Sequence, residues 1–391
     1  MKLPFLRKSK SFQTGFIALD FNDKSVKALY LEVNPDKTLT AKGVSTKVTH
    51  NKNDIIAQED VKIVIEDALI QSGGTTNEVI VGLSGSSVFG FVLIAKSTRE
   101  KPENKITDTE ISEIYDKIRN SAYTQAKQRW TSFFADDVDF EPLDLVVASV
   151  QIDAKTVSEP IGETGTTIQV GVFCSYAEQN HYKRVMSILK KLKLSALMVT
   201  TTEYSQSRLL TDFDKNFLLV DIGQDFTDVA VVFGKTIIQT KSFEFGGSYF
   251  TQNLIHNMNI DEASAKGKKE AFALETLPED EMDKVGDYLY SAGKHWRSAF
   301  SAILTSMSGI KSFPKKIYLT GGGANLPIIQ ELLFEEEWRQ SIPFASSLEI
   351  ETVSSDKLQN RIKDELSLLK GPQMFVPASL GIIKLELDNS E

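Results

Sequence analysis

The segment Val220–Asp228, which reads VDIGQDFTD, is an apolar strand that runs into an acidic turn containing one glycine and on toward a second apolar strand. A weaker version of this pattern, IALDFNDKSVKAL, opens the chain at Ile17–Leu29. Apolar runs around a short turn of Asp, Asn and Gly are typical of a β-hairpin. Two such hairpins about 200 residues apart indicate two similar subdomains that face each other across a cleft of phosphate size.

Composition limits the classes of protein to which this chain can belong. Its 391 residues are 41% hydrophobic and 25% charged, as in a soluble globular protein of two or three domains. The net charge of −9 gives no overall attraction to nucleic acid, so we exclude nucleic acid as the main partner. One cysteine, Cys174, cannot form an internal disulfide, and no signal peptide is evident, so we expect a cytoplasmic protein.

Membrane contact is expected to be peripheral at most. Apolar runs such as Phe89–Ala95 are far shorter than the roughly 20 residues that a membrane-spanning helix needs. The first ten residues carry four cations, three large apolar side chains and no acid. Such a basic stub is either a solvated tail or a weak contact with anionic lipid.

Alternating strand and helix patterns follow the first hairpin and predict a layered α/β core. Thr107–Glu110 matches a capping box, which predicts a helix running toward Trp130. The patterns divide the chain into a basic N-terminal stub (1–15), a first lobe (16–78 and 167–214), a subdomain inserted into it (79–166), a second lobe (215–257 and 309–373), a helical subdomain of that lobe (258–308) and a C-terminal return to the first lobe (374–391).

Three features could carry chemistry. Asp20 and Asp221 each end an apolar strand, where a carboxylate can hold the water shell of Mg²⁺ and the N–H groups of the next turn can bind phosphate oxygens. The alternative is an ordinary acidic β-turn, which uses the same residues. Gly321–Gly323 follow an apolar strand and precede a helix, so the backbone can approach a flat group closely beside a helix N-terminus. A tight strand-to-helix turn is the alternative there.

The ordered set of two acidic hairpins, a Gly-Gly pair after a strand and the Gly-Gly-Gly-Ala turn resembles the actin-like ATPase superfamily. More narrowly, it is similar to the bacterial group of the cell-division protein FtsA and the type IV pilus assembly protein PilM. The resemblance runs from Phe16 to about Leu387 and includes the inserted segment around Val81–Gly85 and Glu159–Gly165. It implies an α/β, actin-like (ribonuclease H-like) two-lobed ATPase fold with a small β/α subdomain inserted in the first lobe.

The resemblance also implies ATP and Mg²⁺ between the two lobes, with Asp20 and Asp221 near the metal. It assigns no catalytic residue. It assigns contacts with the cofactor to Asp20, Asn22, Lys27, Asp221, Gly223, Thr227, Gly246, Gly247, Lys266, Gly321, Gly322 and Gly323.

Both phosphate loops depart from the family pattern. Asn22 and Asp23 stand where the first loop favours glycine and small hydroxyl residues, and Gln224, Asp225 and Phe226 stand where the second favours glycine and threonine. A carboxylate about 4 Å from a phosphate costs about 4 kcal/mol at an effective dielectric constant of about 20. The departures therefore weigh against tight nucleotide binding.

The functional expectation is an adaptor of the FtsA type on the inner face of the cell membrane, at most a weak ATPase. It would assemble with copies of itself, as a filament or dimer, and bind the tail of a tubulin-like division protein. The alternative is a PilM-like platform that binds a cytoplasmic peptide of a pilus membrane protein. The ending at Asp388–Glu391, without an amphipathic helix, favours PilM, whereas the inserted module favours FtsA. A scaffold that binds no nucleotide and an active ATPase or phosphotransferase are further alternatives.

Overall fold

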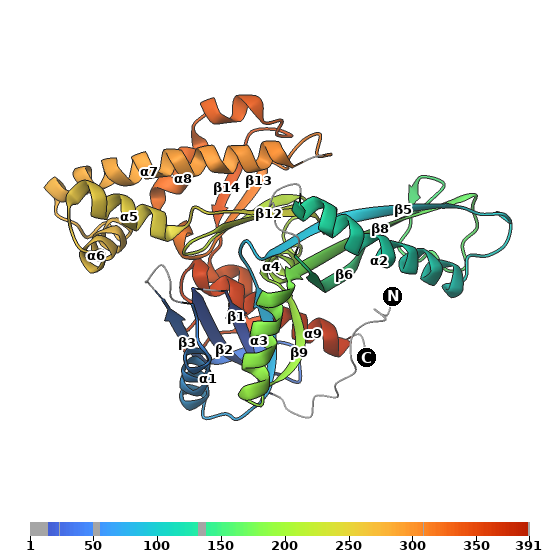
Figure 1. The fold of residues 1–391 in the computed structure, drawn as a ribbon, viewed down its shortest axis with the longest axis horizontal. Coiled ribbons are helices and arrows are strands. Elements are labelled where there is room, and N and C mark those ends of the chain that lie inside the picture. The colour runs from blue at the N-terminus through green and yellow to red at the C-terminus, as the bar shows by residue number, and fades with distance from the viewer. Residues whose placement is uncertain (1–14, 23, 50–54, 132–137, 308, 390–391) are drawn as a thin grey trace.

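The computed structural model describes residues 15–22, 24–49, 55–131, 138–307 and 309–389 (Figure 1). Almost all of the predicted basic stub, together with Asp23, lies outside these ranges. Two sheets organise the described residues, one in each lobe, and an elongated arm extends away from both lobes (Figure 1). No helix in the described ranges is long and apolar enough to cross a membrane.

The first lobe is built on a six-stranded sheet in the order β15-β3-β2-β1-β4-β9. β1 pairs antiparallel with β2 and parallel with β4, so the first hairpin lies at the centre of the sheet. Every residue of β1 is buried, as expected for a strand covered on both faces. The strand bounds are Gly15–Phe21 (β1), Ser25–Val33 (β2), Leu39–Val48 (β3), Glu78–Leu83 (β4), Ser195–Thr201 (β9) and Ile362–Lys363 (β15).

Helices cover both faces of this sheet. On one face, α1 (Gln58–Ser72) and α3 (Gln179–Lys191) pack on alternate residues of β1, such as Ile17 and Leu19. On the other face lie α4 (Thr202–Leu210) and the C-terminal helix α9 (Phe375–Asn389). The apolar core around α4 and α9 also includes residues of the second sheet, so these two helices fill the space between the lobes.

The second lobe contributes β14, β13, β10, β11 and β12 to a nine-stranded sheet, and the second hairpin (β10–β11) lies among these five strands. The strands are Phe217–Ile222 (β10), Thr227–Phe233 (β11), Thr236–Phe243 (β12), Lys316–Thr320 (β13) and Glu349–Thr352 (β14). Its helices are Gly247–Met258 (α5), Glu262–Ala273 (α6), Glu279–Ser306 (α7) and Pro327–Phe334 (α8). Short 3₁₀ helices span Gly322–Asn325, Glu337–Ser341, Ser355–Leu358 and Pro372–Met374.

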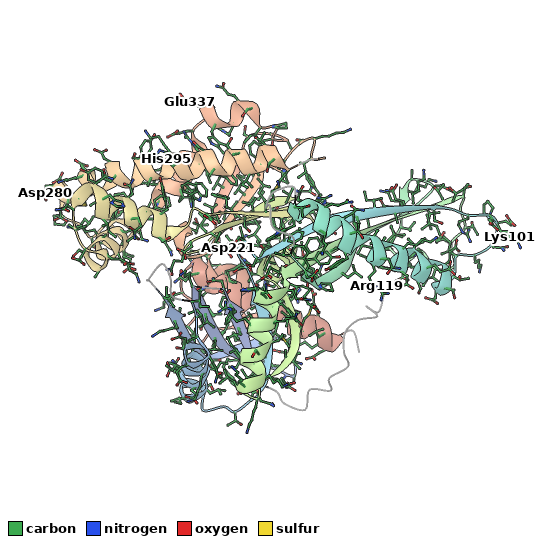
Figure 2. The ribbon with its side chains drawn as sticks, viewed as in Figure 1. Lys101, Arg119, Asp221, Asp280, His295 and Glu337 are labelled. Atoms are coloured by element: carbon green, nitrogen blue, oxygen red, sulfur yellow. The ribbon has the colours of Figure 1, made fainter. Side chains whose placement is uncertain are left out.

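The arm continues the second sheet through β5, β8, β6 and β7, with α2 packed on one face. Figure 1 shows it reaching away from both lobes, and Figure 2 places Lys101 at its tip. Its bounds are Val88–Thr98 (β5), Asp108–Thr131 (α2), Phe140–Ile152 (β6), Lys155–Thr156 (β7) and Thr167–Glu178 (β8). Since β4 belongs to the first sheet and β8 to the arm, we propose Val88–Glu178 as the bounds of the insertion, in place of 79–166.

The predicted helix toward Trp130 is confirmed as α2, but its predicted capping box forms only in part. The N–H of Glu110 donates to Thr107 Oγ1 at 3.3 Å. The Glu110 carboxylate instead pairs with the buried guanidinium of Arg99 at 2.7 Å. Arg99 also donates to the carbonyl oxygens of Pro102 and Gly165. The Glu110 carboxylate therefore belongs to a set of contacts around Arg99 instead of capping α2.

Candidate functional site

The two acidic hairpins meet where the lobes meet, and Asp221 lies at the centre of the molecule (Figure 2). Asp20 is paired with Lys27 across β1–β2, and Asp221 with Asp228 across β10–β11. All three aspartates are buried. Burial alone would lower the pKa of Lys27, but the charges of Asp20 and Asp221 and the hydrogen bond to Asp20 raise it. The structure therefore brings together three of the predicted residues, Asp20, Lys27 and Asp221.

The first loop binds its own donors. Asn22 Oδ1 accepts the backbone N–H groups of Lys24 at 2.9 Å and Ser25 at 2.7 Å. Asn22 Nδ2 donates to Ser25 Oγ at 2.9 Å. Lys27 Nζ lies 2.5 Å from Asp20 Oδ2. The N–H groups of Lys24 and Ser25 and the ammonium of Lys27 are thus bound to oxygens of the chain itself.

The second loop also binds part of its own donor set. The N–H of Gly223 donates to the carbonyl oxygen of Phe226 at 2.9 Å. Thr227 Oγ1 donates to the carbonyl oxygen of Phe245 at 2.6 Å and accepts from Trp296 Nε1 at 2.9 Å. The Thr227 hydroxyl is fully buried and uses its one hydrogen within the second lobe. Its contacts hold the hairpin to α7.

The Gly246–Gly247 pair lets the second loop pack directly against the start of α5. A Cβ on Gly246 would lie 2.4 Å from the carbonyl oxygen of Gln224. The N–H of Gly247 donates to the carbonyl oxygen of Gly223 at 2.9 Å, and that of Ser248 to Gln224 at 2.8 Å. Close contact between loop and helix therefore accounts for Gly246, whereas a Cβ on Gly247 would lie no nearer than 3.5 Å to its neighbours.

Two of the three consecutive glycines pack against the end of β10. Gly321 has a φ of +80°, and a Cβ there would lie 2.3 Å from Asp221 Oδ1. A Cβ on Gly323 would lie 2.2 Å from Ile222 Cγ2. Gly322 faces open space, because a Cβ added to it would meet no atom of the described chain within 4 Å. The tight-turn alternative therefore explains Gly321 and Gly323 without a ligand.

Alanine at Gly323 is expected to lower the free energy of unfolding by about 1–3 kcal/mol, because its Cβ would overlap Ile222. Alanine at Gly322 is the matched control, and we expect it to change stability by less than about 0.5 kcal/mol. Urea unfolding of both variants measures the difference. Equal stability of the two variants would contradict the packing explanation.

Lys269 of α6 contacts α5. Predicted residue Lys266 has a side chain that is 47% exposed, with Nζ 4.0 Å from Glu270 Oε1. Lys269 Nζ donates to the carbonyl oxygen of Gly247 and to Thr251 Oγ1, both at 2.7 Å. Burial lowers the pKa of Lys269 to about 8. The predicted contact of Lys266 with the nucleotide stays a prediction.

Sequence analysis missed the polar residues at the start of α4 and on β11. Glu203, Gln206 and Asp228 are buried beside Asp221, and Gln206 Nε2 donates to Asp221 Oδ2 at 2.8 Å. Within the described part of the chain, Glu203 Oε2, Gln206 Oε1 and the hydroxyls of Thr202 and Thr320 lack a hydrogen-bond partner. One sequence signal could have found Glu203. It is an acid in the first turn of a helix that directly follows the strand Ser195–Thr201.

Burial and mutual repulsion shift the pKa values of these acids upward. Burial raises the pKa of Asp221 to about 6 and that of Asp228 to about 7. Burial, followed by the charge of Asp228, raises the pKa of Glu203 well above its ordinary value. The interior of the cleft therefore disfavours negative charge near neutral pH.

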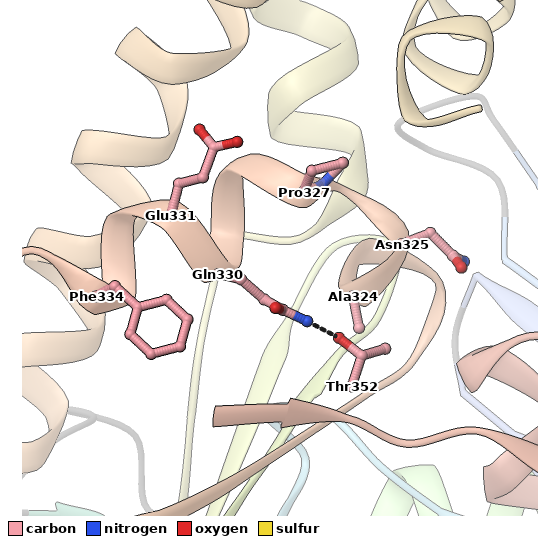
Figure 3. A pocket seen from close by; sticks show the side chains of 7 residues that line it. All are labelled: Ala324, Asn325, Pro327, Gln330, Glu331, Phe334 and Thr352. Atoms are coloured by element: carbon pink, nitrogen blue, oxygen red, sulfur yellow. Dashed lines mark hydrogen bonds between the residues drawn. The ribbon is translucent and has the colours of Figure 1, made fainter. Parts of the chain in front are cut away.

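A hollow of about 460 Å³ lies outside this cleft, between α8 and the edge strand β14 (Figure 3). Gln330 Nε2 donates to Thr352 Oγ1 at 2.6 Å across its floor. It contains none of the predicted site residues; its lining is Ala324, Asn325, Pro327, Gln330, Glu331, Phe334 and Thr352.

Comparison with known families decides what the chain is related to. A family model described as type IV pilus assembly protein PilM matches residues 147–367, which is more than half of the chain. The chain belongs to the PilM family. The predicted resemblance to the FtsA/PilM group is thereby confirmed, and the match favours the PilM alternative over the FtsA interpretation. No curated protein matches the sequence.

Solved structures support the same fold. A chain of the PilM–PilN type IV pilus biogenesis complex matches with a TM-score of 0.63 and 17% identity, over 94% of this chain and 98% of that chain. A diol dehydratase-reactivating factor in nucleotide-free form matches with a TM-score of 0.50 and 9% identity, over 96% and 100% of the two chains. At such identities the likeness concerns the fold alone. The predicted actin-like, two-lobed fold is confirmed.

The actin-like fold implies Mg²⁺ and a nucleotide, and part of the donor set that would face the phosphates is bound within this PilM-family chain. Lys27, Gly223 and Thr227 each donate a hydrogen bond to an oxygen of the chain. Gln206 Oε1 is a buried acceptor without a partner, and an acceptor does not bind a phosphate oxygen. Among the described residues, no three His, Cys, Asp or Glu side chains are placed to hold a metal ion. The nucleotide-binding roles of the predicted residues stay predictions.

Proposed function

We propose that this chain is a platform protein of type IV pilus assembly that binds a short cytoplasmic peptide of a membrane-anchored pilus protein. The match of residues 147–367 to the PilM family carries the proposal. The fold similarity to a chain of the PilM–PilN complex, over 94% of this chain, supports it. In this proposal the chain acts at the inner face of the cell membrane, where its anchored partner holds it.

The proposal replaces the FtsA interpretation as the main expectation. Neither the family match nor the similarity to the PilM–PilN complex supports a role in cell division or binding to a tubulin-like protein. Assembly with copies of itself stays a prediction, and sedimentation of the purified chain at several concentrations measures it.

The expected result of a binding experiment is a saturable interaction with the cytoplasmic peptide of a pilus membrane protein. We expect a Kd on the order of 10 μM, about 7 kcal/mol, when the full chain is titrated with the synthetic peptide from the pilus operon of its host. A scrambled peptide is the control. Binding of a tubulin-like tail peptide with no binding of the pilus peptide would contradict the proposal. Deletion of the gene is expected to abolish surface pili while cells continue to divide.

A further inference from the structure

We propose that Gln224, Asp225 and Phe226 hold the two lobes closed in the place where the fold family holds a nucleotide, so that closure needs no nucleotide. These three residues stand where the second phosphate loop of the family favours small ones. Each makes a defined contact in the structure. We call these three residues the latch. The latch concerns how the two lobes are held together, and it is independent of the peptide partner proposed above.

Gln224 connects the lobes directly. It lies in the turn after β10 of the second lobe, and its Nε2 donates to the carbonyl oxygen of Thr49 at 3.0 Å. Thr49 immediately follows β3 of the first lobe. A glycine at position 224 could not reach across. This departure from the family pattern therefore creates a hydrogen bond between the lobes.

Phe226 makes the second connection. Its ring lies over Gly85, where an added Cβ would be 3.6 Å from Phe226 Cδ2. Gly85 follows β4 of the first lobe and has a φ of +89°, which favours glycine. The N–H of Gly85 also bonds to the carboxylate of Asp228, two residues beyond Phe226. The second hairpin thus contacts the first lobe after β4 as well as after β3.

Asp225 fixes the loop that carries these contacts. Its Oδ1 accepts from Ser248 Oγ at 2.6 Å, at the start of α5. The N–H groups of Gly247 and Ser248 in the first turn of α5 donate to loop carbonyl oxygens, at 2.9 and 2.8 Å. A helix N-terminus can bind an anion only through such N–H groups. Here the loop itself occupies them, so a phosphate would have to displace both the loop and a carboxylate.

Hydrogen exchange tests closure by the latch. In the double variant Gln224→Ala/Phe226→Ala, amides of residues 44–49 and 83–88 are expected to exchange at least five times faster than in the wild type. The matched control Gln359→Ala/Phe334→Ala removes an exposed glutamine and an exposed phenylalanine elsewhere, and should leave these rates unchanged. Equal exchange in both variants would overturn the latch. Retained far-ultraviolet circular dichroism shows that the double variant has folded.

Titration with Mg-ATP and Mg-ADP tests independence from nucleotide. The wild-type chain is expected to give no saturable heat at millimolar nucleotide and no change in the exchange of residues 44–49 or 83–88. Saturable binding of Mg-ATP or Mg-ADP that slows amide exchange at residues 44–49 and 83–88 would overturn the inference. It would do so even if these amides exchange faster in the double variant. Because neither readout involves the pilus peptide, failure here is distinct from failure of the peptide titration.

Discussion

Replacing Asp144 with alanine is expected to lower the free energy of unfolding by about 3–5 kcal/mol. Asp144 lies on β6 of the arm and is almost fully buried. Its carboxylate accepts from Ser175 Oγ at 2.5 Å, from Thr200 Oγ1 at 2.6 Å, and from the N–H and hydroxyl of Thr201 at 3.2 Å. Thr201 is the N-cap residue of α4. One carboxylate therefore connects the arm to the first lobe and to the helix that carries Glu203.

The cost arises because alanine leaves several buried donors without an acceptor. Each unsatisfied buried group costs about 1–3 kcal/mol. Urea unfolding measures the loss. Asp144→Asn keeps one acceptor oxygen and should lose less, and Asp280→Ala, at an exposed position on α7, should change stability by less than about 0.5 kcal/mol. A loss below about 1 kcal/mol for Asp144→Ala would contradict this account.

Replacing Asp228 with asparagine is expected to stabilise the protein above neutral pH. The pKa of Asp228 is about 7 in the folded protein because of burial, against an ordinary value of 3.8. Below about pH 4 the Asp228 carboxyl is protonated in both the folded and the unfolded chain. The free energy of unfolding is then at its highest with respect to this group, because no charge has to be buried. As the pH rises toward about 7, the unfolded chain releases the proton first, so stability falls, and above that it stays low.

One pKa unit corresponds to about 1.4 kcal/mol, so the shift of Asp228 sets a ceiling of about 4 kcal/mol. Asp221 and Glu203 titrate with it, so we expect Asp228→Asn to gain about 2–4 kcal/mol at pH 8 and little at pH 4. Asparagine keeps an oxygen for the Ser242 hydroxyl that now bonds Asp228. The check is urea unfolding across this pH range, with Asp280→Asn as control. A pH profile parallel to that of the wild type would contradict the prediction.

The sequence predicted where the two hairpins meet, but it did not predict which groups bond to one another there. The hairpin patterns located Asp20 and Asp221 at facing strand ends, and the structure brings them together with Lys27. Whether the loop donors were available could not be read from the sequence. Asn22 turns its oxygen back onto its own loop, and Thr227 is held by Trp296, which is 69 residues away along the chain.

The lysine illustrates the limit within a single helix. Lys266 and Lys269 lie three residues apart on α6, and both are plausible from the sequence. Which of the two is buried depends on how α6 packs against α5. In the structure Lys269 faces Gly247 and Thr251, and Lys266 is half-exposed. The sequence does not show this difference in burial, because the register of a helix against its neighbour is a tertiary property.

By itself, the sequence determined the order of strands and helices, the two acidic hairpins, the turn at Gly321–Gly323 and the three unusual residues at 224–226. These depend on periodicity and turn chemistry over a few residues, which any short segment carries with it. Tertiary structure decided what those residues do. Gln224 meets Thr49 across 175 residues, and Asp144 meets Thr200 across 56. Contacts of this kind exist only once the two lobes and the arm have packed, because burial then fixes which partner each polar group can reach.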